Sequence, residues 1–107
     1  MALPSLRKLV QDGLTADRAV QIGSICWEIA SQGGPHCWFF LLINRSMSPL
    51  LDDVGPVEAD AAENVLRRLQ SAILKGLDCV CEDNSNGLVA VANEITGAVV
   101  DFHLLPS

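Results

Sequence analysis

The sequence predicts a single α+β domain in which helices pack on a four-stranded antiparallel or mixed sheet. Three segments repeat apolar residues at helical spacing, and four shorter segments are rich in apolar residues and bounded by turn formers. Their order along the chain is α-α-β-α-β-β-β, which is typical of an α+β fold. Because 107 residues, half of them hydrophobic, suit one core, we expect residues 1–107 to form one domain.

Two helices are expected at the start of the chain. Segment 4–12 carries apolar residues at helical spacing, and Gly13 suits the end of that helix. Thr15 is a suitable N-cap for a second helix, because its side-chain oxygen can accept a hydrogen bond from a backbone N–H of the first turn. The Gly-Gly-Pro sequence at 33–35 should end this helix, since glycine allows a left-handed backbone and proline cannot continue a helix.

Residues 36–44 form the most hydrophobic stretch, and its aromatic side chains favour a strand. Both faces of such a strand would be apolar, with Phe39 on one face and Trp38 and Phe40 on the other. A strand of this kind lies centrally in a sheet and is covered on both sides, although a protein partner could cover one face instead. Residues 44–56, which contain two prolines, a glycine and two aspartates, are expected to form a loop.

The third helix is the clearest element of the sequence. Apolar residues form a continuous stripe over residues 61–77, polar residues occupy the other face, and Gly76 is expected to end the helix. Glu63 and Arg67 lie four residues apart, in the order that stabilises a helix by about 0.3 kcal/mol. Leu69, in the middle of the stripe, is expected to be a core residue.

Three short strands are expected after this helix. Residues 83–87 end in Asn-Gly, and residues 95–97 contain Thr-Gly, so both segments predict tight connections. The expected strands are residues 78–82, 88–93 and 98–105.

One part of this region also fits a helix. Leu88, Val91, Ala92 and Ile95 lie at helical spacing. We favour strands here, because the segment is short and turn-forming residues bound it on both sides.

The sequence contains no motif that predicts catalysis or a cofactor. Neither a glycine-rich phosphate loop nor a Gly-x-Ser-x-Gly nucleophile motif is present. Asp101 and His103 would share one face of the last strand, where a carboxylate can orient an imidazole as a general base, but no nucleophile is identifiable beside them. A surface neighbour pair is the simpler interpretation. We therefore expect a protein that is not an enzyme and that binds no cofactor.

The four cysteines are interpreted as reduced, metal-free side chains. Cys79 and Cys81 would share one face of a strand. Neither this pair nor Cys26 and Cys37 match the Cys-x(2–4)-Cys pairs of zinc sites. In a reducing compartment, cysteine behaves as a small buried hydrophobic residue.

The sequence predicts a cytoplasmic protein that does not enter a membrane. Arg7 and Lys8 interrupt the region in which an export signal would be apolar. The longest apolar run, residues 37–43, is far too short to span a bilayer.

Charge is unevenly distributed along the chain. The formal net charge is −6, to which residues 1–50 contribute +1 and residues 51–107 contribute −7. This distribution disfavours nucleic acid as a partner, because binding of phosphates requires a basic surface. The acidic half suits a basic protein partner, and it equally suits simple solubility.

Acidic residues concentrate where a loop meets the third helix. Five carboxylates within residues 52–63 fit a solvated helix start, an epitope for basic groups of another protein, or a hard cation, although their spacing is not that of an EF-hand loop. Two more acids follow the third helix, and Trp38 is a candidate interface residue because tryptophan is enriched at binding hot spots. No metal site is predicted. The predicted partner-binding residues are Asp52, Asp53, Glu58, Asp60, Glu63, Glu82, Asp83 and Trp38.

A small acidic domain without a catalytic constellation suits a dedicated protein inhibitor. In size, acidity and lack of an active site it is similar to bacterial immunity proteins, which neutralise toxins and many of which oppose basic nucleases. On this interpretation the acids steer and dock a basic cognate toxin, and the bound domain occludes its active site. The alternative is a secretion chaperone or dimeric adaptor, which holds a client or a second copy of itself through an apolar face.

Overall fold

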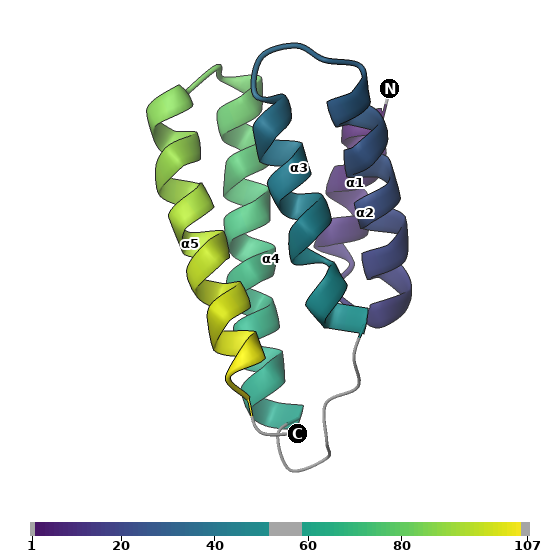
Figure 1. Cartoon of the computed structure of the whole chain (residues 1–107), viewed down its shortest axis with the longest axis vertical. Coiled ribbons are helices and arrows are strands. Elements are labelled where there is room, and N and C mark those ends of the chain that lie inside the picture. The colour runs from purple at the N-terminus through teal and green to yellow at the C-terminus, as the bar shows by residue number, and fades with distance from the viewer. Residues whose placement is uncertain (1, 52–58, 106–107) are drawn as a thin grey trace.

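The computed structural model describes residues 2–51 and 59–105, and these residues form helices and contain no strand. The α+β fold predicted from the sequence is therefore wrong, and the chain forms a small all-α bundle (Figure 1). The elements in chain order are α1 (Ala2–Gln11), α2 (Ala16–Ser31), α3 (Cys37–Ser46), the 3₁₀ helix η1 (Ser48–Leu51), α4 (Ala59–Cys81) and α5 (Ser85–His103).

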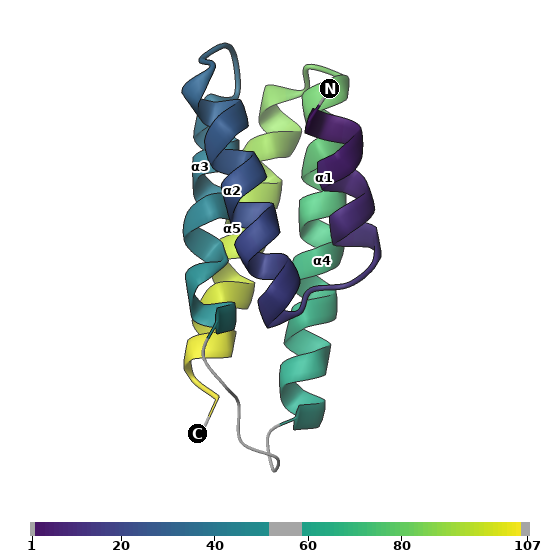
Figure 2. The same ribbon diagram turned by 90° about the vertical axis from the view of Figure 1, so that its right-hand side faces the viewer.

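Successive helices run in opposite directions along the long axis of the bundle (Figures 1 and 2). Helix α1 packs against α2 and α4, α2 packs against α3, α3 packs against α5, and α5 packs against α4. We call the end of the bundle at the top of Figure 1 the upper end. It consists of the first turn of α1, the α2–α3 connection (residues 32–36) and the α4–α5 connection (residues 82–84). The opposite end, with the first turns of α2 and α4, is the lower end.

The core lies along the bundle axis, and all five α-helices contribute to it. Each helix buries residues three or four positions apart, as expected for amphipathic helices. Helix α4, the longest element, supplies a stripe from Ala62 to Leu77 that faces the other helices. The largest fully buried side chains are Phe39, Leu6, Ile22, Ile43, Leu69, Ile73, Leu77, Leu88, Ile95, Val10 and Cys26.

The predicted central strand at residues 36–44 is wrong, because this segment forms α3. Phe39, Phe40, Ile43 and Met47 are buried together, and their spacing of one, three and four residues matches one side of a helix. The Phe39 ring packs against the backbone of α4 at Gly76. Strand propensity is a weak preference, and burial of this apolar side against α4 and α5 overrides it.

The three strands predicted over residues 78–105 are also wrong. Residues 78–81 extend α4, which continues past Gly76, and residues 85–103 form one uninterrupted helix, α5. Helical spacing of the buried residues explains this result, because Leu88, Val91 and Ile95 continue into Ala98 and Phe102. Gly76 does not end α4; it lies buried inside the helix beneath the Phe39 ring.

The predicted starts and stops near the beginning of the chain are confirmed. Thr15 caps α2, with its hydroxyl oxygen accepting a hydrogen bond from the Arg18 backbone N–H at 3.2 Å. Gly13 and Gly33 adopt left-handed backbone angles after the ends of α1 and α2. The run of turn formers at 83–87 contains the cap of α5, because the Asn84 side chain accepts from the Gly87 N–H at 3.0 Å.

Candidate functional site

The structure separates the predicted partner-binding residues into two groups. Asp60 and Glu63 lie in the first turns of α4, at the lower end, whereas Glu82, Asp83 and Trp38 lie at the upper end. The 23 residues of α4 span about 34 Å at 1.5 Å per residue, so the two groups cannot belong to one small epitope. The remaining predicted residues, Asp52, Asp53 and Glu58, lie outside the described residues.

A side-chain contact links the two connections at the upper end. The His36 imidazole Nε2 lies 2.6 Å from the Asp83 carboxylate, and the His36 side chain is only 10% exposed. Both residues adopt a left-handed backbone, with φ of 69° and 55°. This conformation is uncommon for residues other than glycine, and the surrounding structure must enforce it. The contact fixes the start of α3, and therefore Trp38, beside the α4–α5 connection.

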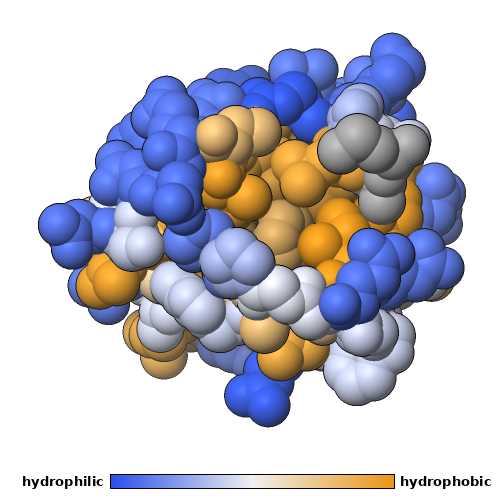
Figure 3. All heavy atoms as spheres, turned by 90° about the horizontal axis from the view of Figure 1, so that it is seen from above, coloured by the Kyte–Doolittle hydropathy of each residue, from blue (hydrophilic) through white to orange (hydrophobic). Residues whose placement is uncertain are grey.

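Apolar side chains gather in the centre of the upper end. Seen from above, this end has a hollow apolar centre flanked on several sides by hydrophilic residues (Figure 3). The terminal turns of the helices that meet here supply half-buried apolar side chains, and Trp38 on α3 is 42% exposed. The half-buried apolar residues of these turns are Leu3, Ile29, Ala30, Cys37 and Val80.

Most cations of the bundle are matched with acids along its sides. Within residues 2–51 and 59–105, four acids form ion pairs with arginine or lysine, and Glu63 is one of them. Glu82 and Asp60 are exposed and form no ion pair in the described part of the chain. Each end therefore has an exposed acid without an ion pair on or beside α4, and Asp17 and Glu28 of α2 are likewise exposed and unpaired among the described residues. The four pairs are Arg7–Asp78, Arg67–Glu63, Arg68–Asp101 and Lys75–Glu94.

A second surface, the α3–α5 face, carries little charge. Val89, Thr96 and Val100 are exposed at spacings of seven and four residues, so they lie on one side of α5. Both acids inside α5, Glu94 and Asp101, instead pair with cations of α4. Helix α3, packed against this side of α5, contains one charged residue, Arg45. The strands predicted for this region do not place these residues on one face, whereas the helical spacing of residues 89, 96 and 100 does.

The cysteines occupy different environments. Cys79 and Cys81 do not share a face as predicted, because they lie two residues apart on a helix; Cys79 is half-buried and Cys81 is exposed. All four thiols are free. Burial of Cys26 raises the pKa of its thiol from 9.0 to about 12, since the core disfavours the charged thiolate.

Cys81 should react with iodoacetamide in the folded protein, whereas Cys26 should not. Thiolate is the reactive form, and the raised pKa of Cys26 leaves roughly 1000-fold less thiolate at neutral pH, in addition to steric protection. Mass spectrometry of tryptic peptides after timed labelling measures both rates. Labelling of Cys26 at the rate of Cys81 without denaturant would show that the thiol is not in the core.

Asp101 and His103 do not form the predicted neighbour pair. They lie two residues apart on α5, and Asp101 binds the Arg68 guanidinium at 2.7 Å. Over residues 2–51 and 59–105, no three His, Cys, Asp or Glu side chains gather as a metal site would require. In the same residues, no helix combines the length and apolar character of a membrane span.

Comparisons with protein-family models, with curated proteins and with solved structures gave no match for this chain.

Proposed function

We propose that this chain is a non-enzymatic protein-binding domain that docks a basic partner on its upper end. The observation that supports this most is that the exposed Trp38 lies at the same end of the bundle as Glu82 and Asp83, an end whose centre is apolar. Protein interfaces combine an apolar core with a polar rim in this way. Of the predicted binding residues in the described part of the chain, these three lie at the upper end, and Asp60 and Glu63 lie at the lower end.

Each part of this surface has a distinct physical role in binding. Trp38 provides a large, rigid side chain whose burial against a partner excludes water, as tryptophan does at binding hot spots. Exposed Glu82 adds negative charge at the rim, and rim charges act mainly on the rate of association. The His36–Asp83 contact links the two connections before binding, although the Asp83 side chain is 82% exposed, and this link reduces the conformational entropy that binding would cost.

The specific form that we propose is an immunity protein that neutralises a basic cognate toxin, such as a nuclease. A nuclease needs a positively charged cleft for its substrate. The acidic upper end of the bundle would compete with nucleic acid for this cleft and occlude the active site. The net charge of −6 favours attraction to such a partner over long distances.

Replacement of Trp38 by alanine tests the apolar part of the proposal. After the partner has been co-purified from the native host and identified, Trp38→Ala should weaken its binding roughly 30-fold, the effect of a hot-spot residue. Trp27→Ala is the matched control, because Trp27 is also exposed, at 57%, but lies on α2. Titration calorimetry measures both affinities. If Trp27→Ala weakens binding and Trp38→Ala does not, the outer side of α2 is the binding surface.

A secretion chaperone or adaptor is the second candidate, and the α3–α5 face favours it. Val89 and Val100, at 55% and 49% exposure, lie on a face with almost no charge, which suits a broad apolar contact with a client. For this function, Val89→Ser with Val100→Ser should weaken client binding, and raising the salt concentration should leave it unchanged. The inhibitor predicts the opposite response to both changes.

A further inference from the structure

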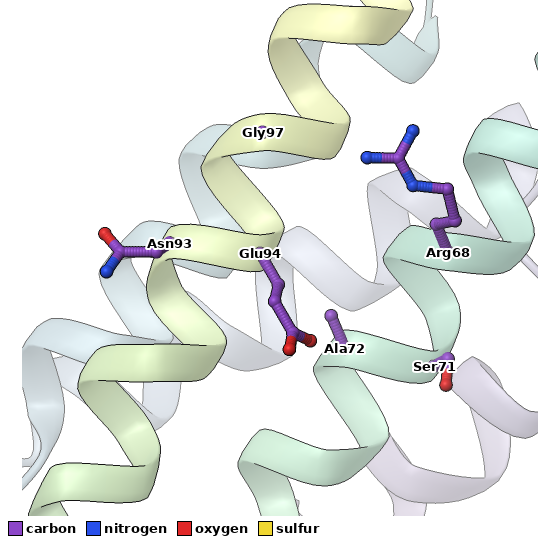
Figure 4. A pocket seen from close by; sticks show the side chains of 6 residues that line it. All are labelled: Arg68, Ser71, Ala72, Asn93, Glu94 and Gly97. Atoms are coloured by element: carbon purple, nitrogen blue, oxygen red, sulfur yellow. The ribbon is translucent and has the colours of Figure 1, made fainter.

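We propose that the groove between α4 and α5 binds a second copy of this chain and forms a symmetric dimer. The groove has a volume of about 400 Å³ and is lined by Arg68, Ser71, Ala72, Asn93, Glu94 and Gly97. Arg68 extends from α4 towards α5, and Glu94 extends from α5 towards α4 (Figure 4). Neither residue belongs to the surface proposed above for a basic partner, so the two proposals are independent.

No packing contact within a single copy requires a glycine at position 97. Glycine inside a helix is about 1 kcal/mol less favourable than alanine. Gly76 has a reason, because a side chain there would overlap with the Phe39 ring. At Gly97, by contrast, no atom lies within 4 Å of the position that a Cβ would occupy. Together with small Ser71 and Ala72, it leaves room for the backbone of another helix to approach.

The charges beside the groove identify the occupant as a second copy. Helix α4 carries Arg68 and Lys75, seven residues apart, and α5 carries Glu94 and Asp101, also seven residues apart. Each cation lies opposite one acid at the same position along the bundle axis. The side-chain nitrogen and carboxylate oxygen are 2.7 Å apart in Arg68–Asp101 and 3.7 Å apart in Lys75–Glu94. All four side chains are half exposed, so each can bind a further charge. The α4 rim of the groove is therefore positive and the α5 rim is negative.

This pattern complements itself under one particular symmetry. A two-fold axis parallel to the helices places α4 of one copy opposite α5 of the other at the same height. Arg68 then meets Asp101 of the second copy, and Lys75 meets its Glu94. An axis perpendicular to the helices would instead bring Arg68 close to Lys75 and Glu94 close to Asp101, and like charges would repel. The parallel axis gives a closed, isologous dimer with four helices in contact.

The size of the face indicates a weak dimer. The 19 residues of α5 are about 28 Å long, and two helices side by side are about 20 Å wide, so each copy buries on the order of 600 Å². Stable complexes bury about 800 Å² per partner. We therefore expect a monomer–dimer equilibrium in the micromolar range that weakens as salt screens the rims.

Filling the groove should prevent dimerisation. Sedimentation equilibrium of the full chain, at concentrations up to about 1 mM, should show a monomer–dimer equilibrium for the wild type. Gly97→Leu should raise the dissociation constant at least about tenfold. The control is Thr96→Leu, which introduces the same side chain at an exposed position on the α3–α5 face, away from the groove. A wild type that stays monomeric at about 1 mM, or equal effects of the two variants, would overturn the proposal.

A charge exchange tests the symmetry itself. Arg68→Glu and Asp101→Arg should each remain monomeric, because each places like charges together within and between copies. A mixture of the two variants should form heterodimers, since the new carboxylate on α4 of one copy then meets the new guanidinium on α5 of the other, while the second contact keeps its native residues. Native mass spectrometry distinguishes heterodimers from homodimers. Absence of heterodimers in the mixture, while the wild type dimerises, would rule out the parallel two-fold axis.

Discussion

Leu69→Ala is expected to lower the free energy of unfolding by about 2–5 kcal/mol, the range for a leucine that is fully buried. Leu69 has no exposed surface and lies in the middle of α4, which packs against both α1 and α5. Truncation removes apolar contacts with the core and leaves a cavity that the rigid bundle can close only in part. Since a domain of this size has a total stability of about 5–15 kcal/mol, the loss is a large fraction.

Urea unfolding followed by circular dichroism at 222 nm measures this loss. The slope of the free energy of unfolding against urea concentration must first be shown to be the same for the wild type and the variant. A different slope would mean that the unfolded or native ensemble had changed. Arg67→Ala, on the exposed side of the same helix, is the control and should change stability by less than about 0.5 kcal/mol. A loss below about 1 kcal/mol for Leu69→Ala would show that α4 does not bury this face.

Gly76→Ala is expected to destabilise the bundle by about 1–3 kcal/mol or more, although alanine is the better helix former. A Cβ at Gly76 would lie 2.8 Å from two Phe39 ring carbons, Cε1 and Cε2, and would overlap with Cζ between them. Because Phe39 is fully buried, its ring cannot move aside without disturbing other core residues. The close contact between α3 and α4 therefore depends on this glycine.

Gly97→Ala is the matched control for this prediction. It makes the same chemical change in a helix, but no atom lies within 4 Å of the new Cβ. Measured in dilute protein, where the monomer dominates, it should stabilise the fold by up to about 1 kcal/mol. A lower free energy of unfolding for Gly76→Ala and a higher one for Gly97→Ala would support the packing of Phe39 against Gly76. Stabilisation by both would show that Phe39 does not contact α4 at Gly76.

The helices at the start of the chain and the core face of α4 could be predicted from the sequence, because local signals and periodicity agreed there. Thr15 and Gly13 mark helix ends through backbone chemistry that does not depend on the rest of the fold. The stripe through Leu69 repeats over enough turns to exclude a strand.

In α3 and α5, two kinds of local sequence signal favoured the wrong structure. In α3, the aromatic side chains of Trp38, Phe39 and Phe40 favour a strand locally, but the contact of Phe39 with Gly76 is made only in the folded bundle. In α5, Thr96 and Gly97 predict a tight turn locally, although both residues lie inside a helix. A single glycine costs a long helix only about 1 kcal/mol, which burial of Leu88, Ile95 and Phe102 easily exceeds.

The residues of the proposed binding site follow from residue type in the sequence, but their location in the fold does not. Charge predicts Glu82 and Asp83 as partner-binding residues, and residue type predicts Trp38 as an interface residue. They lie at one end because α3 begins and α4 ends there, beside the His36–Asp83 contact between two connections far apart in the sequence, and no local pattern reports this arrangement. Charge alone groups Asp60 and Glu63 with Glu82 and Asp83. The length of α4 places Asp60 and Glu63 at the lower end instead.

The most direct test of the proposed function compares two charge reversals at opposite ends of the bundle. Association of the co-purified partner is followed by stopped flow at low and at physiological salt. Glu82→Lys should slow association roughly tenfold at low salt, and less at physiological salt, where the Debye length falls to about 8 Å. Asp60→Lys, which makes the same change at an exposed acid of the lower end, should leave the rate close to that of the wild type. If Asp60→Lys slows association and Glu82→Lys does not, or if neither changes the rate, the upper end is not the surface that binds the partner.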